Sequence, residues 1–339
     1  MSIDSKADAP GRSPEILRRT LRVVSRAGAS AGIAVPLAIL WIIFAFKIPE
    51  FLTAANISNL FLAGSVVGVL ALGSTIVILA EEIDLSIGAV EGLTSVMAAI
   101  VIIEHGVSWP LGIAITLGVG LVVGLLNGGI TTLANVPSFI VTLGMMGVAG
   151  GLALILTDGQ SIYGFPTDYQ YIGQGELSGI RMPVYVFLGL LLVLWIALRF
   201  TRFGWHIYAT GGNRTAARLV GIRTTRVRIA AFAISGLCAA LAGILVSARL
   251  DTGSPIFGRF DLLDAIAAVV IGGTSLAGGA GSIVATAFGV ILITTVRNGL
   301  NLMDISPFWQ DFTIGAIIVV SAILSELNRR LQARRRFSP

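Results

Sequence analysis

Four carboxylic acids lie close together in the segment ILAEEIDLSIGAVEG, residues 78–92, between two long apolar runs. An ionisable side chain at the centre of a bilayer costs about 2.5–3.5 kcal/mol on insertion scales, so such groups usually face a cavity or lie near an interface. Two interpretations remain open. Asp84 and Glu91 could carry coupling ions in a proton- or sodium-driven transporter. Alternatively, Glu81, Glu82 and Asp84 form a turn at the membrane interface, in which Asp84 caps a helix beginning at Leu85.

A second group of polar residues is uncharged and lies in or at the ends of the apolar runs. Hydroxyl and amide groups can exchange hydrogen bonds with a polyol without trapping a charge, which suits the lining of a translocation path. The alternative is that they form hydrogen bonds between helices, each worth well under about 2 kcal/mol. With Asp84, the candidates for the path are Ser86, Asn127, Asn135, Ser138, Thr142 and Asn298.

Signals for enzymatic chemistry are missing from the sequence. It contains no G-x-x-x-x-G-K-[ST] phosphate-binding loop, no C-x-x-C and no H-E-x-x-H. The two histidines, His105 and His206, are expected on opposite sides of the membrane, and Cys238 lies in an apolar run where a small packing residue is expected. We therefore expect no catalytic residues, no metal site and no cofactor in this chain.

The composition indicates a membrane protein. The 339 residues are 55% hydrophobic and 12% charged, with a mean hydropathy of +0.90. One uncharged run, 105–157, is long enough for two crossings of about 20 residues each. The pI of about 9.9 does not indicate nucleic-acid binding, because 18 of the 23 basic residues lie in three short segments that flank apolar runs: 1–26, 199–228 and 329–336.

These elements predict an all-α protein with about ten transmembrane helices. The crossings are expected near 30–47, 57–79, 85–103, 109–133, 138–157, 183–200, 229–250, 264–280, 282–300 and 308–326.

Basic residues mark the cytoplasmic side of a multi-pass protein. Ten crossings place both termini inside, so we expect a basic tail at 1–28, a transmembrane domain at 29–327 and a second basic tail at 328–339. Within the domain, 201–228 is then a cytoplasmic loop and 158–182 lies outside, in agreement with the charges.

Two of these crossings have uncertain ends. The stretch 264–280 contains four glycines and can be a half-helix followed by a loop, while 138–157 begins after Pro137 and can start within the membrane. Interrupted helices at membrane depth are found where they are buried in protein or line a wet cavity. A faint similarity between 84–92 and 274–282, together with the topology, is compatible with an inverted repeat.

The segment GGNRTAARLVGI, residues 211–222, predicts a short amphipathic helix. Asn213 is a good N-cap and Gly221 is placed where a glycine ends a helix. Arg214 and Arg218 share one face, and such a short helix must pack on something to be stable. It could lie on the lipid interface with its arginines near anionic headgroups, or dock into a partner protein.

Taken together, these motifs resemble the permease family of bacterial ABC importers for monosaccharides, the family of the ribose permease. The resemblance covers about residues 50–325. It is carried by five motifs in the family's order: IDLSIG (83–88), VPSFIVTLGMM (136–146), GGNRTAARLVGI (211–222), DAIAAVVIGGTSLAGGAGS (264–282) and NGLNLM (298–303).

The resemblance implies an inner-membrane permease that works with other proteins. Its expected partners are a second permease copy (the same chain or a paralogue), an ABC ATPase that binds ATP and Mg²⁺, and a periplasmic sugar-binding protein. It also implies that 211–222 is the helix that couples to the ATPase. The residues assigned to this role are Gly211, Gly212, Asn213, Arg214, Ala217, Arg218, Leu219, Gly221 and Ile222.

The sequence departs from the family pattern at two places. Glu81 and Glu82 stand where the family often has Gly-Gly or Gly-Glu. The family commonly has an acidic residue two positions before Asp264, where this chain has Leu262 preceded by Asp261. These differences leave the substrate open among pentoses, hexoses, polyols and autoinducer-like compounds.

Overall fold

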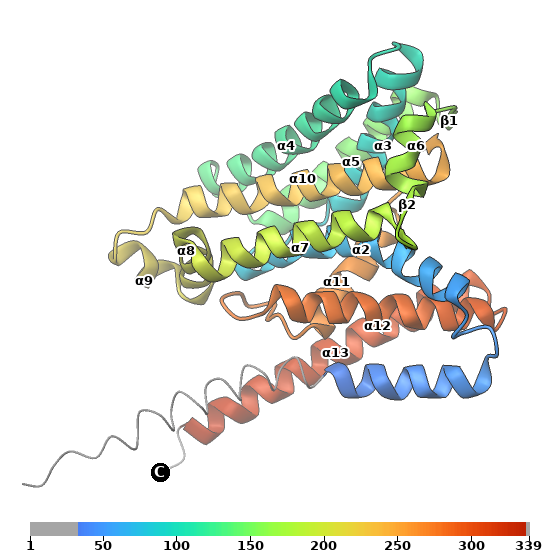
Figure 1. Ribbon diagram of the computed structural model, residues 1–339. Helices are drawn as coiled ribbons and strands as arrows, with labels where there is room; N and C mark the ends of the chain where they lie inside the picture. Colours follow the sequence, from blue (N-terminus) through green and yellow to red (C-terminus); the bar gives the residue numbers. More distant parts are fainter. Residues whose placement is uncertain (1–32, 337–339) are drawn as a thin grey trace, which may run out of the picture.

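The computed structural model describes residues 33–336 and is almost entirely helical. Its long helices run side by side, so that the molecule has two ends (Figure 1). The short helices α8 (Arg202–Gly212) and α9 (Arg214–Leu219) lie at one end, together with the end of α13 (Pro307–Arg336). The opposite end carries α6 (Thr167–Gln174) and the short strands. The predicted tail 1–28 lies outside the described residues, and most of the predicted tail 328–339 continues α13.

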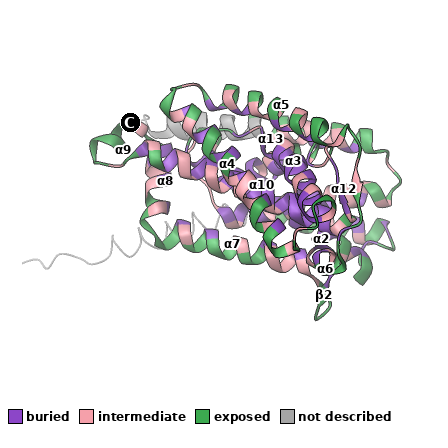
Figure 2. Ribbon diagram, turned by 90° about the horizontal axis from the view of Figure 1, so that it is seen from above, coloured by how far each residue is buried: buried purple, intermediate pink, exposed green. Residues whose placement is uncertain are grey.

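The centre of the bundle is formed by α2 (Ala54–Leu79) and α10 (Thr224–Leu250), which pack against each other. Both are buried over most of their length, whereas the outer helices are largely exposed (Figure 2). Many of the exposed side chains on the outer helices are large and apolar. The exposed apolar surface suits a lipid environment, in which hydrocarbon tails replace water. The outer helices are α4 (Trp109–Leu133), α5 (Ser138–Thr157) and α7 (Met182–Phe200).

Glycines bring α4 close to α10. A Cβ atom added at Gly124 would lie 2.3 Å from the carbonyl oxygen of Phe232, and one at Gly120 would lie 2.3 Å from that of Gly236. The glycines of the Gly120/Gly124/Gly128 spacing therefore serve helix packing. The Gly147/Gly151 spacing on α5 does not, since a Cβ at either position meets nothing within 4 Å among the described residues.

Two helices near the centre are interrupted. After the non-helical segment 80–86, α3 (Ile87–Ala99) continues as a π-helical stretch, Ile100–Glu104. After 251–260, α11 (Asp261–Ile271) has only 11 residues and is followed by the non-helical segment 272–282. The half-helix predicted within 264–280 is therefore confirmed, and α5 is a complete helix of 20 residues.

One pattern of long and short helices occurs twice along the chain. A long helix, a break and a short helix occur both in α2–α3 and in α10–α11, and two further helices follow each time: α4 and α5, then α12 (Ile283–Leu302) and α13. The start of α3 touches the second break, because a Cβ at Gly88 would lie 2.2 Å from the Gly258 carbonyl oxygen and one at Gly258 would lie 2.2 Å from that of Gly88. This arrangement agrees with an inverted repeat centred on the broken helices.

Among the described residues, seven helices are long and apolar enough to cross a membrane: α2, α3 with its π-helical extension, α4, α5, α7, α10 and α12. The helix Ile33–Lys47, the half-helix α11 and the long α13 are further elements that a ten-crossing topology would use. Ten crossings are compatible with the structure, and the number stays a prediction.

The segment 158–182, predicted as an outer loop, is ordered by contacts with the end of α10. Strand β1 (Ile162–Tyr163) pairs with β4 (Thr252–Gly253), and β2 (Glu176–Leu177) pairs with β3 (Ile180–Arg181), both antiparallel. Tyr169 of α6 is fully buried and its hydroxyl lies 2.7 Å from Ser247 Oγ. This loop therefore forms a firm cap on one end of the bundle.

Candidate functional site: the α9 end and the polar segment behind it

Helix α9 has the caps that the sequence predicts. The Asn213 side chain accepts a hydrogen bond from the Ala216 backbone N–H at 2.9 Å. Gly221 has a φ of 85°, the left-handed conformation that glycine adopts without strain. Gly221 N–H donates to the Arg218 carbonyl and Ile222 N–H to the Ala217 carbonyl, so the last turn is closed at both positions.

The faces of α9 differ from what the arginines suggested. Arg214 points toward its own chain and contacts two carboxylates there. Arg218 remains exposed, with its Nε donating to Thr224 Oγ1 at 3.0 Å. The outward surface is apolar: Leu219 is 84% exposed and Val220 77%, while Ala217 is buried.

The carboxylates that Arg214 contacts belong to the segment after α2. Its Nη2 lies 2.8 Å from Glu82 Oε1 and 3.1 Å from Glu81 Oε2. The same Glu82 oxygen accepts a hydrogen bond from the Nε of Arg228, at the start of α10. The Glu82 and Arg228 side chains are almost completely buried, whereas the Glu81 side chain is 46% exposed. Glu82 therefore joins three elements in one buried ion-pair cluster.

The glycines before α9 allow a close backbone contact. A Cβ at Gly211 would lie 1.9 Å from the Leu79 carbonyl oxygen and 2.6 Å from the Gly279 nitrogen. That carbonyl accepts a hydrogen bond from Gly279 N–H at 3.0 Å. The α8–α9 junction thus touches the end of α2 and the 272–282 segment together, while Gly212 is exposed and borders Gly279.

A polar cavity of about 380 Å³ opens beside this cluster. Thr131 Oγ1 and Arg214 Nε, both in its wall, have no hydrogen-bond partner among the described residues. Two of the predicted path residues, Asn135 and Ser138, are also in the wall. The full lining is Glu81, Glu82, Thr131, Asn135, Val136, Pro137, Ser138, Arg214 and Arg228.

Two other path candidates, Ser86 and Asn127, form one buried network with Asp84. Ser86 donates to Asp84 Oδ1 from its backbone N–H at 3.0 Å and from its hydroxyl at 2.6 Å. Ser235 of α10 donates to Asp84 Oδ2 at 2.8 Å. Asn127 of α4 donates to Ser86 Oγ at 2.9 Å. Asp84 therefore ties the segment before α3 to α10 and, through Ser86, to α4.

The predicted capping role of Asp84 needs a correction. Helix α3 begins at Ile87, with Ser86 as the N-cap, and not at Leu85. Asp84 lies two residues before this cap and holds Ser86 in a local turn, because its short side chain reaches the N–H two positions ahead.

Ser138 and Thr142 also hold the segment after α2. Ile83 N–H donates to Ser138 Oγ at 3.2 Å, and Thr142 Oγ1 donates to the Ile83 carbonyl at 3.3 Å. Because both residues lie in the first turns of α5, they fix this helix to Ile83. Asp84, Ser86, Asn127, Asn135, Ser138 and Thr142 thus belong to one region of the molecule.

Asn298 lies elsewhere. Its side chain exchanges two hydrogen bonds, of 2.8 and 3.0 Å, with Asn56 in the first turn of α2. The α9 contacts lie at the other end of α2, about 33 Å away for 22 residues of helix. The structure therefore does not bring Asn298 together with the other path candidates.

The remaining buried acids lie where α11 packs. Glu91 is fully buried beside Asp261, and Asp264 accepts two hydrogen bonds from Arg297 of α12. Arg297 also contacts Asp311 at 3.0 Å. No grouping of three or more metal-ligating side chains occurs among residues 33–336. Nothing in this arrangement favours Asp84 and Glu91 as ion-coupling carboxylates, since Asp84 is fully engaged with serine donors.

The residues that the sequence reasoning missed are mainly Arg228, Glu82 and Ser235. From the sequence, Glu82 is expected in a turn at the membrane interface, and Arg228 is one of the basic residues that mark the cytoplasmic side. Their partners are 132, 146 and 151 positions away in the sequence. The departure from the family pattern at Glu81–Glu82 was the one signal in the sequence that pointed to this cluster.

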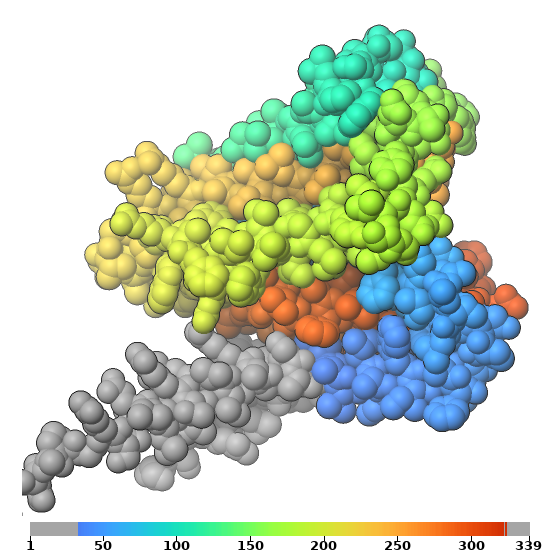
Figure 3. Space-filling model, viewed as in Figure 1, coloured from blue at the N-terminus to red at the C-terminus, as the bar shows by residue number. Residues whose placement is uncertain are grey.

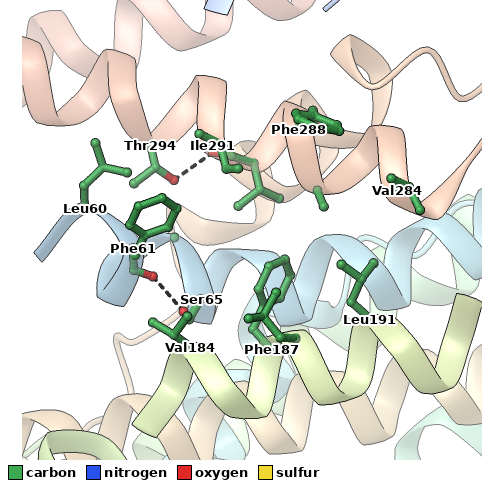
Figure 4. Close-up of a pocket in the computed structure, with 14 residues that line it drawn as sticks. Leu60, Phe61, Ser65, Val184, Phe187, Leu191, Val284, Phe288, Ile291 and Thr294 are labelled. Atoms are coloured by element: carbon green, nitrogen blue, oxygen red, sulfur yellow. Dashed lines mark hydrogen bonds between the residues drawn. The ribbon is translucent and has the colours of Figure 1, made fainter. Parts of the chain in front are cut away.

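A second cavity, of about 280 Å³, lies between α2, α7 and α12 and is not suited to a polar ligand (Figure 4). Its lining is almost wholly apolar, including Phe61, Phe187 and Phe288. The hydroxyls of Ser65 and Thr294 donate to carbonyls of their own helices and offer no free hydrogen-bonding group.

The helical bundle, the broken central helices and the short capped helix at one end define a membrane permease. Comparison with known proteins agrees: residues 56–322 match the family described as "Branched-chain amino acid transport system / permease component". The chain belongs to this family.

Several curated relatives carry the word permease in their names. The chain is 42% identical to the ribose import permease protein RbsC of Bacillus subtilis, over 84% of this chain and 89% of the relative. It is 39% identical to RbsC of Escherichia coli K12, over 81% and 87% of the two chains. It is 35% identical to the xylose transport system permease protein XylH of E. coli K12, over 83% and 87%. No solved structure matches the chain.

Proposed function

We propose that this chain is the permease subunit of an ATP-driven ABC importer that carries a monosaccharide or a related polyol across the bacterial inner membrane. The observation that carries the proposal is the similarity to ribose and xylose permeases over more than four fifths of the chain. Because those relatives are named for pentoses, pentoses are the first substrates to test.

ATP hydrolysis belongs to a partner subunit in this proposal, since the chain has no phosphate-binding loop. Helix α9 is the docking element for that partner. Leu219 and Val220 supply an exposed apolar tip beside the exposed Arg218, a combination that fits a protein groove with an apolar floor and an acidic edge. ATP and Mg²⁺ would then bind in the partner and not in this chain.

The opposite end suits a periplasmic sugar-binding protein. The cap formed by residues 158–182 exposes Tyr163 and Tyr171, aromatic residues of the kind enriched at protein interfaces. A second permease copy, identical or paralogous, would pack against α5, whose Gly144, Gly147 and Gly151 are open to close helix approach. The remaining exposed apolar surface would contact lipid. The basic segments support a cytoplasmic position for α9 and both termini.

Reconstitution in proteoliposomes tests the proposal. The permease, a candidate ATPase with phosphate-binding loops and a candidate sugar-binding protein are combined, and uptake of ribose and xylose is measured with and without ATP. Uptake should require ATP and all three proteins, and should survive a proton uncoupler. Uptake that persists without ATP and collapses with the uncoupler would overturn the proposal.

A further inference from the structure

The ion-pair cluster around Glu82 joins α9 to the rest of the permease, so a movement of α9 would be transmitted through it. One oxygen of Glu82 is shared by Arg214, the first residue of α9, and Arg228, in the second turn of α10. The carboxylate has 4% of its side chain exposed, and Arg228 has 6%. A charge buried this deeply is held firmly by its partners, because separating them would leave an uncompensated charge away from water.

The residues on either side of Glu82 extend this contact inward. The Glu82 backbone N–H donates to the Val77 carbonyl, so the backbone of this residue is anchored to the end of α2. Ile83 is held on both its N–H and its carbonyl by Ser138 and Thr142 of α5. Asp84 is held by Ser86 and by Ser235 of α10. Three consecutive residues therefore connect α9 to α2, α5 and α10.

Helix α9 also reaches the second broken element. Gly211 lies against both the Leu79 carbonyl and the Gly279 nitrogen, and Gly279 belongs to the segment that follows the half-helix α11. The α8–α9 junction is thus in backbone contact with the segments that follow α2 and α11. Figure 3 shows α8 and α9, in yellow, packed without a visible gap onto the end of the bundle.

We propose that Glu82 is the positioning residue through which α9 controls the broken segment 80–86: the Arg214–Glu82–Arg228 ion pairs carry a displacement of α9 to Ile83 and thereby to α5. The two sides of α9 then have different tasks. Leu219 and Val220 face a partner, whereas Arg214 forms ion pairs within the permease itself. The inference rests on the proposed function only for the identity of the partner that moves α9.

Amide hydrogen exchange on the purified permease tests the Arg214–Glu82 contact without any transport assay. Arg214→Ala should speed exchange at the amides of Ile83 and Ser86 by about fivefold or more, the lower range of coupling between sites. Arg218→Ala is the matched control, because Arg218 belongs to the same helix and bonds to Thr224. Equal exchange at 80–86 in wild type and Arg214→Ala, or an equal rise in both variants, would overturn the proposal.

Transport tests the consequence. Glu82→Gln keeps the size of the side chain and removes its charge, and Glu81→Gln is its neighbour with the same Arg214 contact but no contact to Arg228. In the reconstituted complex, Glu82→Gln should lower the uptake of ribose per ATP hydrolysed by about fivefold or more. Glu81→Gln, which leaves the Glu82 contacts to both arginines in place, should lower this ratio less. A merely structural role would lower uptake and ATP hydrolysis together. An unchanged ratio of uptake to ATP hydrolysis in Glu82→Gln would contradict the proposal. Absence of ATP-dependent uptake in wild type would contradict the proposed function instead. In that case the amide exchange at 80–86 would still decide whether Arg214 holds this segment.

Discussion

Removal of the Asp84 carboxylate should destabilise the permease because three donors depend on it. The side chain is 5% exposed and accepts from Ser86 N–H, Ser86 Oγ and Ser235 Oγ. A hydrogen bond to a charged group contributes about 1.5–3 kcal/mol, which gives about 4.5–9 kcal/mol for three independent bonds. Two of the donors are hydroxyls that can rotate to other acceptors, so we expect about 3–5 kcal/mol for Asp84→Ala.

Asp84→Asn should cost much less. The amide oxygen can still accept both bonds from Ser86, and the amide nitrogen can donate to the Ser235 hydroxyl, which is also an acceptor. The expected loss is about 1 kcal/mol, because only the charge and the direction of one bond change.

The assay is the apparent Tm of the purified permease in detergent, together with ATP-driven ribose uptake of the reconstituted complex. Asp84→Ala should lower the Tm clearly more than Asp84→Asn, and Asp84→Asn should retain uptake. Equal Tm losses in the two variants would refute the hydrogen-bond reasoning. Loss of uptake in a stable Asp84→Asn protein would instead support a role for the ionised carboxylate in coupling.

Three further predictions concern packing, capping and docking. Gly124→Ala should cost about 1–3 kcal/mol by overpacking against the Phe232 carbonyl. Gly147→Ala has open space around it and should not lower the Tm of the monomer, because alanine is the better helix former. Thermal unfolding of both variants measures this, and equal losses would contradict the packing argument. Asn213→Ala should cost about 1 kcal/mol of local helix stability by removing the hydrogen bond from Ala216 N–H. The loss should appear as faster amide exchange in α9. Unaltered exchange would contradict the capping role of Asn213. Leu219→Glu should weaken binding of the ATPase subunit at least about tenfold by placing a charge in an apolar interface. Co-purification and titration measure the affinity, and a normal Tm is the control. Full affinity would show that α9 is not part of the interface.

Local features of the sequence determined much of the fold. Composition and uncharged runs predicted a helical membrane protein, and the helix predicted at 138–157 coincides with α5. Asn213 and Gly221 predicted the ends of α9 because caps act on backbone groups within a few residues. The glycines of 264–280 predicted the break after α11, since glycine disfavours a continuous helix.

The tertiary structure alone decided which side chains meet. Glu82 lies 132 positions from Arg214 and 146 from Arg228, and no periodicity or spacing indicates that one of its oxygens serves both arginines. The same holds for Asp84 with Ser235, and for Asn298, whose partner Asn56 removes it from the other path candidates. Helix caps are local and can be read from a few residues, whereas an ion pair between helices depends on how every intervening helix packs.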